Sequence, residues 1–369
     1  MKIGILTQPL HNNYGGLLQA YALQHYLKQQ GHIAITIDFK KTYKPKLWGI
    51  KGITINFIRK YILKQNISSI LPLNEKKISQ HTEKFISKNI ERTQEITNPN
   101  QLKILSQYNF DAYIVGSDQV WRPAYSPGIS AFFLDFLGND TTTKRIAYAA
   151  SFGINNCDEF STEELATYSL LAKKFDAIGV REDSAVDLCD THLRIKAEQV
   201  LDPTLLLSQN DYYNLITDAP PSPFTSDIMI YVLDKSEEKN KIINHITQEI
   251  KLEPYDFLEN NIDNIYASVS KWLKGFYDSK FVITDSFHGV VFSIIFNKPF
   301  IAIGNKDRGL TRFTSLLKLF GLENRLILSL KDINANIVKD PIDYSKVNKI
   351  LYAEQKKSID FLQKALSDK

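Results

Sequence analysis

The sequence lacks the features that mark several classes of protein. It has two cysteines, Cys157 and Cys189, which lie far apart and form no CxxC pair, so we expect reduced side chains in a cytoplasmic protein. No group of possible ligands has recognisable metal-site spacing, so we predict no metal. No apolar run approaches the roughly 20 residues that cross a bilayer, and the first residues show no signal-peptide pattern. The net charge of +4 is too small to predict nucleic-acid binding.

The length and one proline-rich segment predict the domain organisation. A chain of 369 residues exceeds the usual size of one hydrophobic core, so we expect two domains. Asp218–Asp227 contains three prolines and is the best candidate for a linker. We therefore predict a first domain over residues 1–217, a second over 228–342 and a terminal helix over 343–369.

Alternating strands and helices predict an α/β fold in both domains. The first domain opens with a strand at Lys2–Thr7, a helix at Leu17–Gln30 and a strand at Ile33–Phe39. Further strands are expected at Asp111–Val115, Lys144–Ser151, Ala177–Val180, Gln199–Leu201, Ile228–Leu233 and Tyr255–Leu258. Further helices are expected at Ser236–Ile250, Val269–Ser279, Leu310–Phe320 and Asp343–Ser367. We read the whole as two Rossmann-like domains that face each other across a cleft.

The stretch Phe281–Gly304 holds the strongest candidate site. It reads as a buried strand, a turn, an apolar helix from about Gly289 and a second strand. Ligands of such folds bind at the carboxyl edge of the sheet, beside helix N-termini. The turn carries Asp285, Ser286 and His288, so an acid, a hydroxyl and an imidazole fall at that edge. The alternative is structural, because Ser or Asp before a helix is often only its N-cap.

Other polar residues also follow predicted strands. Arg181 comes directly after the strand Ala177–Val180, where it faces a ligand or pairs with Glu182 or Asp183. Lys306, Arg308 and Arg312 follow the strand that ends the central stretch. Two glycine-containing turns also follow predicted strands. The first contains Asn13, Tyr14, Gly15 and Gly16, and the second contains Ser117, Asp118, Gln119 and Trp121. Neither turn is a GxGxxG dinucleotide fingerprint.

Residues 40–107 form an excursion from the first domain, and its first half is basic. No acidic residue occurs between Phe39 and Asn74, where lysines and arginines alternate with Tyr43, Trp48, Phe57 and Tyr61. Such a pattern suits an anionic membrane surface or a phosphate-bearing acceptor. A solvated basic face is the simpler alternative.

Six motifs together resemble the polysaccharide pyruvyl transferases. They are NNYGGLLQAYALQ (Asn12–Gln24), DAYIVGSDQVW (Asp111–Trp121), RIAYAASFG (Arg145–Gly153), AIGVREDSA (Ala177–Ala185), VLDPTLLL (Val200–Leu207) and VITDSFHGVVFSIIFNKPFIAI (Val282–Ile303). They occur in the family's order over nearly the whole chain. Many members carry Arg-Leu-His where this sequence has Ser286-Phe287-His288, so one cation beside the histidine is missing.

The resemblance implies a GT-B-like fold and a transferase. Members move the pyruvyl group of phosphoenolpyruvate to a sugar, with no cofactor beyond that donor substrate. We then expect His288 as acid and base, Asp285 as the residue that orients it, and a donor-binding side in the second domain. The residues expected to bind the donor are Arg181, Ser286, Gly289, Lys306, Arg308 and Arg312. The two glycine turns of the first domain would hold the saccharide acceptor, with Trp121 stacked on a sugar ring.

Two other functions stay open at this point. A nucleotide-sugar glycosyltransferase could use the same architecture, because a fold does not fix a function. A non-catalytic glycan-binding component of a polysaccharide assembly complex is the second alternative. The acceptor sugar and the oligomeric state are not predicted.

Overall fold

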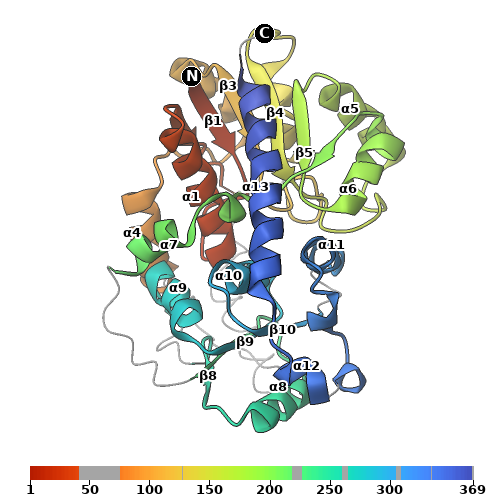
Figure 1. The fold of residues 1–369 in the computed structure, drawn as a ribbon. Helices are drawn as coiled ribbons and strands as arrows, with labels where there is room; N and C mark the ends of the chain where they lie inside the picture. Colours follow the sequence, from red (N-terminus) through yellow and green to blue (C-terminus); the bar gives the residue numbers. More distant parts are fainter. Residues whose placement is uncertain are drawn as a thin grey trace, which may run out of the picture.

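The computed structural model describes residues 1–40, 75–126, 128–217, 227–259, 265–304, 309–333 and 335–367. Within them the chain forms two parallel β-sheets, each flanked by helices (Figure 1). The first sheet has the strand order β2-β1-β3-β4-β5-β6 and the second has the order β11-β10-β9-β7-β8. The predicted α/β class and the two Rossmann-like sheets are therefore confirmed.

The first sheet is built from the strands that the apolar runs predict. Its strands are β1 (Lys2–Leu6), β2 (Ile33–Thr36), β3 (Ala112–Val115), β4 (Lys144–Ala150), β5 (Ala177–Val180) and β6 (Glu198–Gln199). Every residue of β3 is buried, as expected for a central parallel strand covered on both faces. The strand β4 contains an irregularity between Ala147 and Ala150, where its pairing with β5 shifts in register.

The second sheet is also built largely from strands that the apolar runs predict, and its strands are shorter. It contains β7 (Ile228–Tyr231), β8 (Pro254–Asp256), β9 (Phe281–Thr284), β10 (Phe300–Ile303) and β11 (Leu326–Ile327). The strands β7, β9 and β10 are buried throughout. All pairings in both sheets are parallel, so each sheet has one edge at which all of its strands end.

The helices begin where side chains can cap their free N–H groups. Asn13 caps α1, Ser236 caps α8 and Ser286 caps α10, each accepting a backbone N–H of the first turn. The larger helices are α1 (Tyr14–Gln29), α4 (Gln80–Asn89), α5 (Thr162–Ala172), α7 (Gln209–Ile216), α8 (Glu237–Ile250), α9 (Val269–Asp278), α10 (Phe287–Ile295), α11 (Thr311–Phe320) and α13 (Tyr344–Leu366). The shorter helices are α3 (Glu75–Ile78), α6 (Asp183–Leu188) and α12 (Ala335–Lys339).

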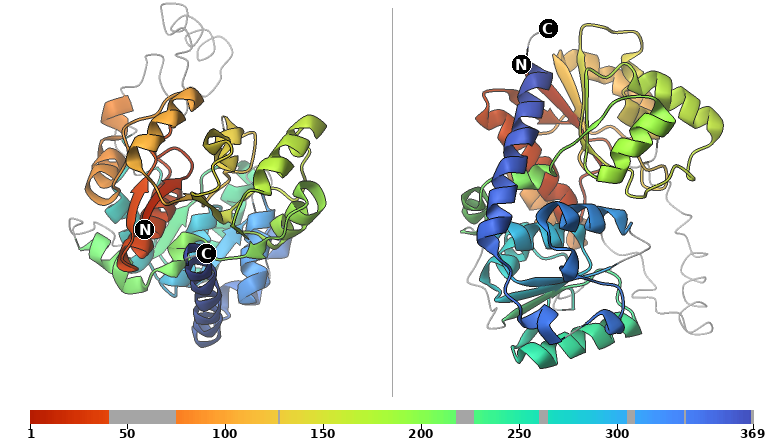
Figure 2. Two further views of the ribbon diagram at one scale, coloured as in Figure 1. Left: turned by 90° about the horizontal axis from the view of Figure 1, so that it is seen from above. Right: turned by 45° about the vertical axis from the view of Figure 1, so that its right-hand side comes forward.

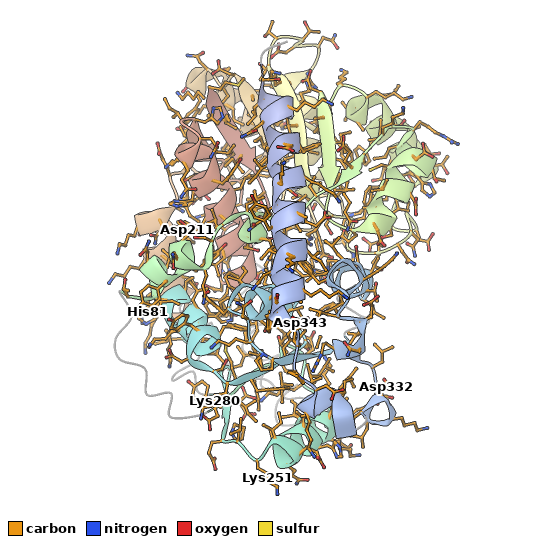
Figure 3. The ribbon with its side chains drawn as sticks, viewed as in Figure 1. His81, Asp211, Lys251, Lys280, Asp332 and Asp343 are labelled. Carbon is orange, nitrogen blue, oxygen red and sulfur yellow. The ribbon has the colours of Figure 1, made fainter. Side chains whose placement is uncertain are left out.

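The terminal helix α13 returns from the second domain to the first. It begins after Asp343, whose carboxylate accepts the N–H of Lys346, and runs along the molecule to the first sheet (Figures 2 and 3). Ser358 of α13 accepts the backbone N–H of Leu201 at 2.9 Å, and Lys144 of β4 donates to the carbonyl of Ala365 at 3.2 Å. The helix therefore ties the two domains together.

Part of the predicted excursion lies outside the described residues. Residues 41–74, with most of the basic and aromatic side chains, belong to that part, whereas α3, α4 and a 3-10 helix at Pro99–Tyr108 are described. Among the helices that the structure describes, none is long and apolar enough to span a membrane.

Candidate active site

The carboxyl edges of the two sheets meet at α1 and α10. The helix α10 follows β9, and α1 follows β1, so both helices start at such an edge. Figure 1 shows α10 in the middle of the molecule with α1 beside it. Their first turns touch, because a Cβ atom at Gly15 would lie only 2.0 Å from Nδ1 of His288. Only glycine allows this close approach of the α1 backbone to the imidazole.

Asp202 of the first domain faces His288 from the other side. Its Oδ2 atom lies 3.6 Å from Nε2 of His288 and accepts hydrogen bonds from Nη1 of Arg181 and from the Ser117 hydroxyl, at 3.0 and 3.1 Å. Its Oδ1 atom accepts the N–H and the hydroxyl of Thr204. One buried carboxylate oxygen therefore joins residues of both domains.

The charges around Asp202 control its ionisation. Burial raises the pKa of this carboxyl, but His288, Arg181 and the Thr204 hydroxyl lower it more, so the pKa lies well below its usual range. The group is therefore ionised across the whole neutral range. Its negative charge faces the imidazole of His288 at 3.6 Å.

Arg181 is buried at the centre of the cluster. Its guanidinium bonds Asp202 and Glu182, with Asp118 at 3.7 Å, and its Cζ atom lies 4.4 Å from the centre of the Phe287 ring. Burial alone would lower the pKa of Arg181, yet these three carboxylates raise it. Arg181 therefore pairs with Glu182, as the structural alternative predicted, and its guanidinium also lies at the carboxyl edge. Its contact with a ligand stays a prediction.

Arg312 brings a second buried guanidinium from α11. Its Cζ atom lies 5.8 Å from the centre of the Phe287 ring, which Arg181 also contacts. Burial and the neighbouring charge of Arg181 lower its pKa to about 10, against the favourable effect of Asp118 and Glu182. Two guanidinium groups that share one small region create a place where an added anion is favoured.

Three buried polar atoms of this cluster form no hydrogen bond with any residue in the described part of the chain. They are Nη2 of Arg181, Nε2 of His288 and Oε2 of Glu182. Unsatisfied buried groups are costly, and in native proteins they often mark a binding or reacting position. Two of the three atoms can donate a hydrogen bond to an anion, and the imidazole nitrogen can also exchange a proton.

Asp285 does not orient His288, contrary to our expectation. Its carboxylate instead accepts the backbone N–H groups of Leu233 and Asp234 at 2.6 and 3.2 Å and pairs with Lys239 of α8 at 2.7 Å. It thus fixes the loop between β7 and α8. The turn after β9 directs this side chain toward its own sheet, and the carboxylate beside His288 is Asp202.

Trp121 is also not a platform for a sugar. The side chain has no exposed surface, its indole N–H donates to the carbonyl of Phe132 at 3.1 Å, and its ring stacks on Phe133. Trp121 therefore belongs to the core of the first domain, and its expected contact with the acceptor is wrong.

Tyr14 likewise has a packing role. Its ring is buried against Trp272 and other aromatic side chains of the second domain, and its hydroxyl donates to the carbonyl of Ala267 at 2.9 Å. Burial raises the pKa of this phenol far above its usual range. Tyr14 joins the domains instead of meeting an acceptor.

The other residues expected to bind a ligand lie in or beside the cluster. Asn13 accepts the N–H of Gly16 as the cap of α1. Ser286 accepts the N–H of Gly289, and a Cβ atom at Gly289 would lie 2.2 Å from Oγ1 of Thr284, so packing explains this glycine. Whether any of them contacts a ligand stays a prediction.

The turn after β3 lies largely inside the protein. The hydroxyl of Ser117 bonds Asp202, Asp118 lies near Arg181, and the side-chain oxygen of Gln119 accepts a hydrogen bond from Arg122 at 3.1 Å. Ser117 has no exposed surface, and Asp118 and Gln119 are also buried, with small exposed fractions.

Lys306 and Arg308 fall outside the described residues. Sequence reasoning missed Asp202, Glu182 and Ser151, whose hydroxyl bonds Glu182 at 2.5 Å. All three lie at or just after the carboxyl ends of predicted strands of the first domain, so the rule that singled out Arg181 could have found them. Within the described ranges, no group of three or more His, Cys, Asp or Glu side chains could hold a metal ion.

The fold belongs to the class with two facing Rossmann-like domains, known as GT-B. A UDP-GlcNAc 2-epimerase from Neisseria meningitidis superposes with a TM-score of 0.53 at 11% identity, covering 99% of this chain and 100% of that one. A putative UDP-N-acetylglucosamine 2-epimerase from Listeria monocytogenes gives 0.53 at 9% identity, with 98% and 95% covered. At these identities the likeness shows the fold alone.

The sequence itself gives the family. Residues 13–307 match the family model described as Polysaccharide pyruvyl transferase, so the chain belongs to this family and is a transferase. The comparison with curated proteins found no match. The matched range includes the buried cluster from Gly15 to His288, whereas Arg312 lies just beyond it.

Proposed function

We propose that this protein transfers the pyruvyl group of phosphoenolpyruvate to a sugar of a surface polysaccharide or of its lipid-linked precursor. The observation that carries the proposal is a pair of buried atoms, Nη2 of Arg181 and Nε2 of His288, beside the second guanidinium of Arg312. Each lies 3.6–3.7 Å from a carboxylate oxygen but forms no hydrogen bond with the described residues. A small dianionic donor substrate suits such a cluster, because guanidinium groups bind carboxylate and phosphate oxygens in a forked geometry.

In this proposal His288 acts as the acid. The imidazole, which faces the carboxylate of Asp202, gives a proton to the methylene carbon of phosphoenolpyruvate, and the neighbouring carbon then becomes electrophilic. A sugar hydroxyl forms a bond to that carbon and loses its proton to the neutral imidazole. A second hydroxyl displaces phosphate and closes a cyclic ketal, and its proton leaves with the phosphate.

The first domain supplies the acceptor side in this proposal. The turns at Asn13–Gly16 and Gly116–Trp121 end at the same edge as Arg181. The basic stretch that follows Phe39 is proposed to bring the protein to an anionic membrane surface that carries the lipid-linked acceptor. The protein would then act in the cytoplasm, at the inner face of the membrane.

Thermal unfolding in the presence of candidate donor substrates tests the proposal. A ligand that binds only the folded state raises the melting temperature by mass action, so even a weak donor has an effect at millimolar concentration. We expect phosphoenolpyruvate to raise the melting temperature and a panel of nucleotide sugars to have no effect. Stabilisation by a uridine or guanosine sugar alone would contradict the proposal and favour a glycosyltransferase.

Two matched substitutions make the result specific. Arg181→Lys keeps the positive charge but removes the fork, and we expect it to abolish the effect of phosphoenolpyruvate. Arg194→Lys makes the same chemical change at an exposed position and should leave the effect intact. Equal responses of the two variants would count against Arg181 as the donor-binding residue.

A further inference from the structure

Tyr125 is an exposed aromatic residue in the loop that contains Trp121. Its side chain is 41% exposed, whereas Trp121 four residues earlier is fully buried. Among the described residues, the other exposed large aromatic side chains are Tyr213 on α7 and Tyr352 on α13. The ring of Tyr213 packs against Tyr277 of α9, with the ring centres 5.4 Å apart.

An arginine packs against one face of the Tyr125 ring. The guanidinium of Arg122 lies over one face of the ring, with Cζ 4.6 Å from the centre. Glu159 fixes this arginine at 2.8 Å and also accepts the backbone N–H of Ala124 at 3.0 Å. The loop therefore presents a pre-oriented ring that packs against Arg122 and keeps 41% of its surface exposed.

The loop stands at the rim of the buried cluster. Arg122 bonds the side chain of Gln119, which packs so closely on Gly153 that a Cβ there would lie 2.0 Å from Oε1. The carbonyl of Gly153 in turn contacts Gly309 of the second domain, just before α11. This series of contacts leads from Tyr125 to Gly309, three residues before Arg312 of α11.

A second observation supports this placement. Tyr125 lies close enough to Arg312 for its phenol to act on the pKa of that guanidinium, although Arg312 is buried and belongs to the other domain. The ring therefore lies on the side of the first domain that contacts Gly309, next to α11.

We propose that Tyr125 is the surface on which a pyranose ring of the acceptor stacks, a role that rests on the proposed function. The C–H face of a pyranose is apolar, and a tyrosine offers rigid, amphipathic area at small entropic cost. Because Arg122 and Glu159 already orient the ring, little further ordering is needed on binding. The loop after β3 thus contacts the acceptor through Tyr125 and contributes Trp121 to the core.

Saturation-transfer NMR on the whole protein tests the inference with simple sugars. The ligands are the methyl glycosides of galactose, glucose, mannose and N-acetylglucosamine at millimolar concentration, with phosphoenolpyruvate present. We expect at least one to bind the wild type, Tyr125→Ala to weaken this binding on the order of tenfold, and Tyr125→Phe to retain it. Tyr352→Ala removes a tyrosine of α13 that is more exposed than Tyr125 and should change nothing.

The outcomes separate this inference from the proposed function. Equal sugar binding by wild type and Tyr125→Ala would overturn the stacking role, and so would failure of every glycoside to bind a protein that phosphoenolpyruvate stabilises. Sugar binding that depends on Tyr125, without stabilisation by phosphoenolpyruvate, would support the stacking role and contradict the proposed donor. Thermal unfolding of each variant checks that the fold is retained.

Discussion

Gly15 and His288 lie in contact across the two domains, where the start of α1 meets the start of α10. A side chain at position 15 would begin 2.0 Å from Nδ1 of the imidazole, so the ring is confined between this backbone and Asp202. The position of His288 therefore depends on how the domains pack, and several consequences can be measured.

Gly15→Ala should displace the imidazole. The added methyl group has to push the ring or separate the domains, which we expect to cost about 1–3 kcal/mol of stability and to reduce turnover at least tenfold. Gly16→Ala is the control for the effect on stability, because its Cβ would meet nothing closer than Asn13 at 3.2 Å. Urea unfolding and phosphate release measure the two effects, and normal turnover in Gly15→Ala would refute this account of the site.

Asp202→Asn should lower stability in a pH-dependent way. Removing one partner of a buried ion pair costs about 3–5 kcal/mol. Because the pKa of Asp202 is lowered in the folded protein, its contribution is fully present above the unfolded value near ~4 and is lost as the pH falls through the folded value. The difference between wild type and variant, measured by denaturant unfolding, should thus be constant from about pH 5 to 8 and shrink in acid.

Asp285→Asn should affect stability without changing the pH dependence of turnover. Its carboxylate pairs with Lys239 and is buried, so breaking the pair is expected to cost about 3–5 kcal/mol. Lys239→Met should cost a similar amount, and a double-mutant cycle should show strong coupling between the two positions. If Asp285→Asn shifted the pH dependence of turnover, Asp285 would act on His288, as the sequence predicted.

Trp121→Phe should leave the acceptor KM unchanged. The indole is enclosed by Phe133 and Phe152 and touches no solvent, so its loss acts on the core. We expect Trp121→Ala to destabilise the protein by about 3–5 kcal/mol, with a smaller loss for phenylalanine. A raised KM in a Trp121→Phe variant of normal stability would show that the ring does reach the acceptor.

Much of the fold could be predicted because strands and helices depend on local pattern. The strand Ala177–Val180 and the capping of α8 by Ser236 agree with prediction. The helix α10 starts at Phe287, two residues before the predicted Gly289, since Ser286 already caps it. The helices α5 and α7 were not predicted, although Ser161 with Glu164 and Ser208 with Asp211 form capping boxes that the sequence displays.

The candidate site was predicted by position more successfully than by role. Polar residues that follow parallel strands gather at one edge, and this rule brought Arg181 and His288 together correctly. It could not tell which of two acids reaches the imidazole. Asp285 is three residues from His288 in sequence, yet Asp202 in the other domain is its neighbour.

The sequence by itself determined the elements, their parallel arrangement and the family, because these depend on apolar periodicity and on motifs along the chain. The packing of the two domains decided which side chains became a site. It placed Asp202 beside His288, buried Trp121 and left Tyr125 exposed. The direction of a side chain depends on the backbone of each turn and on what packs against it, and contacts between residues distant in sequence fix both.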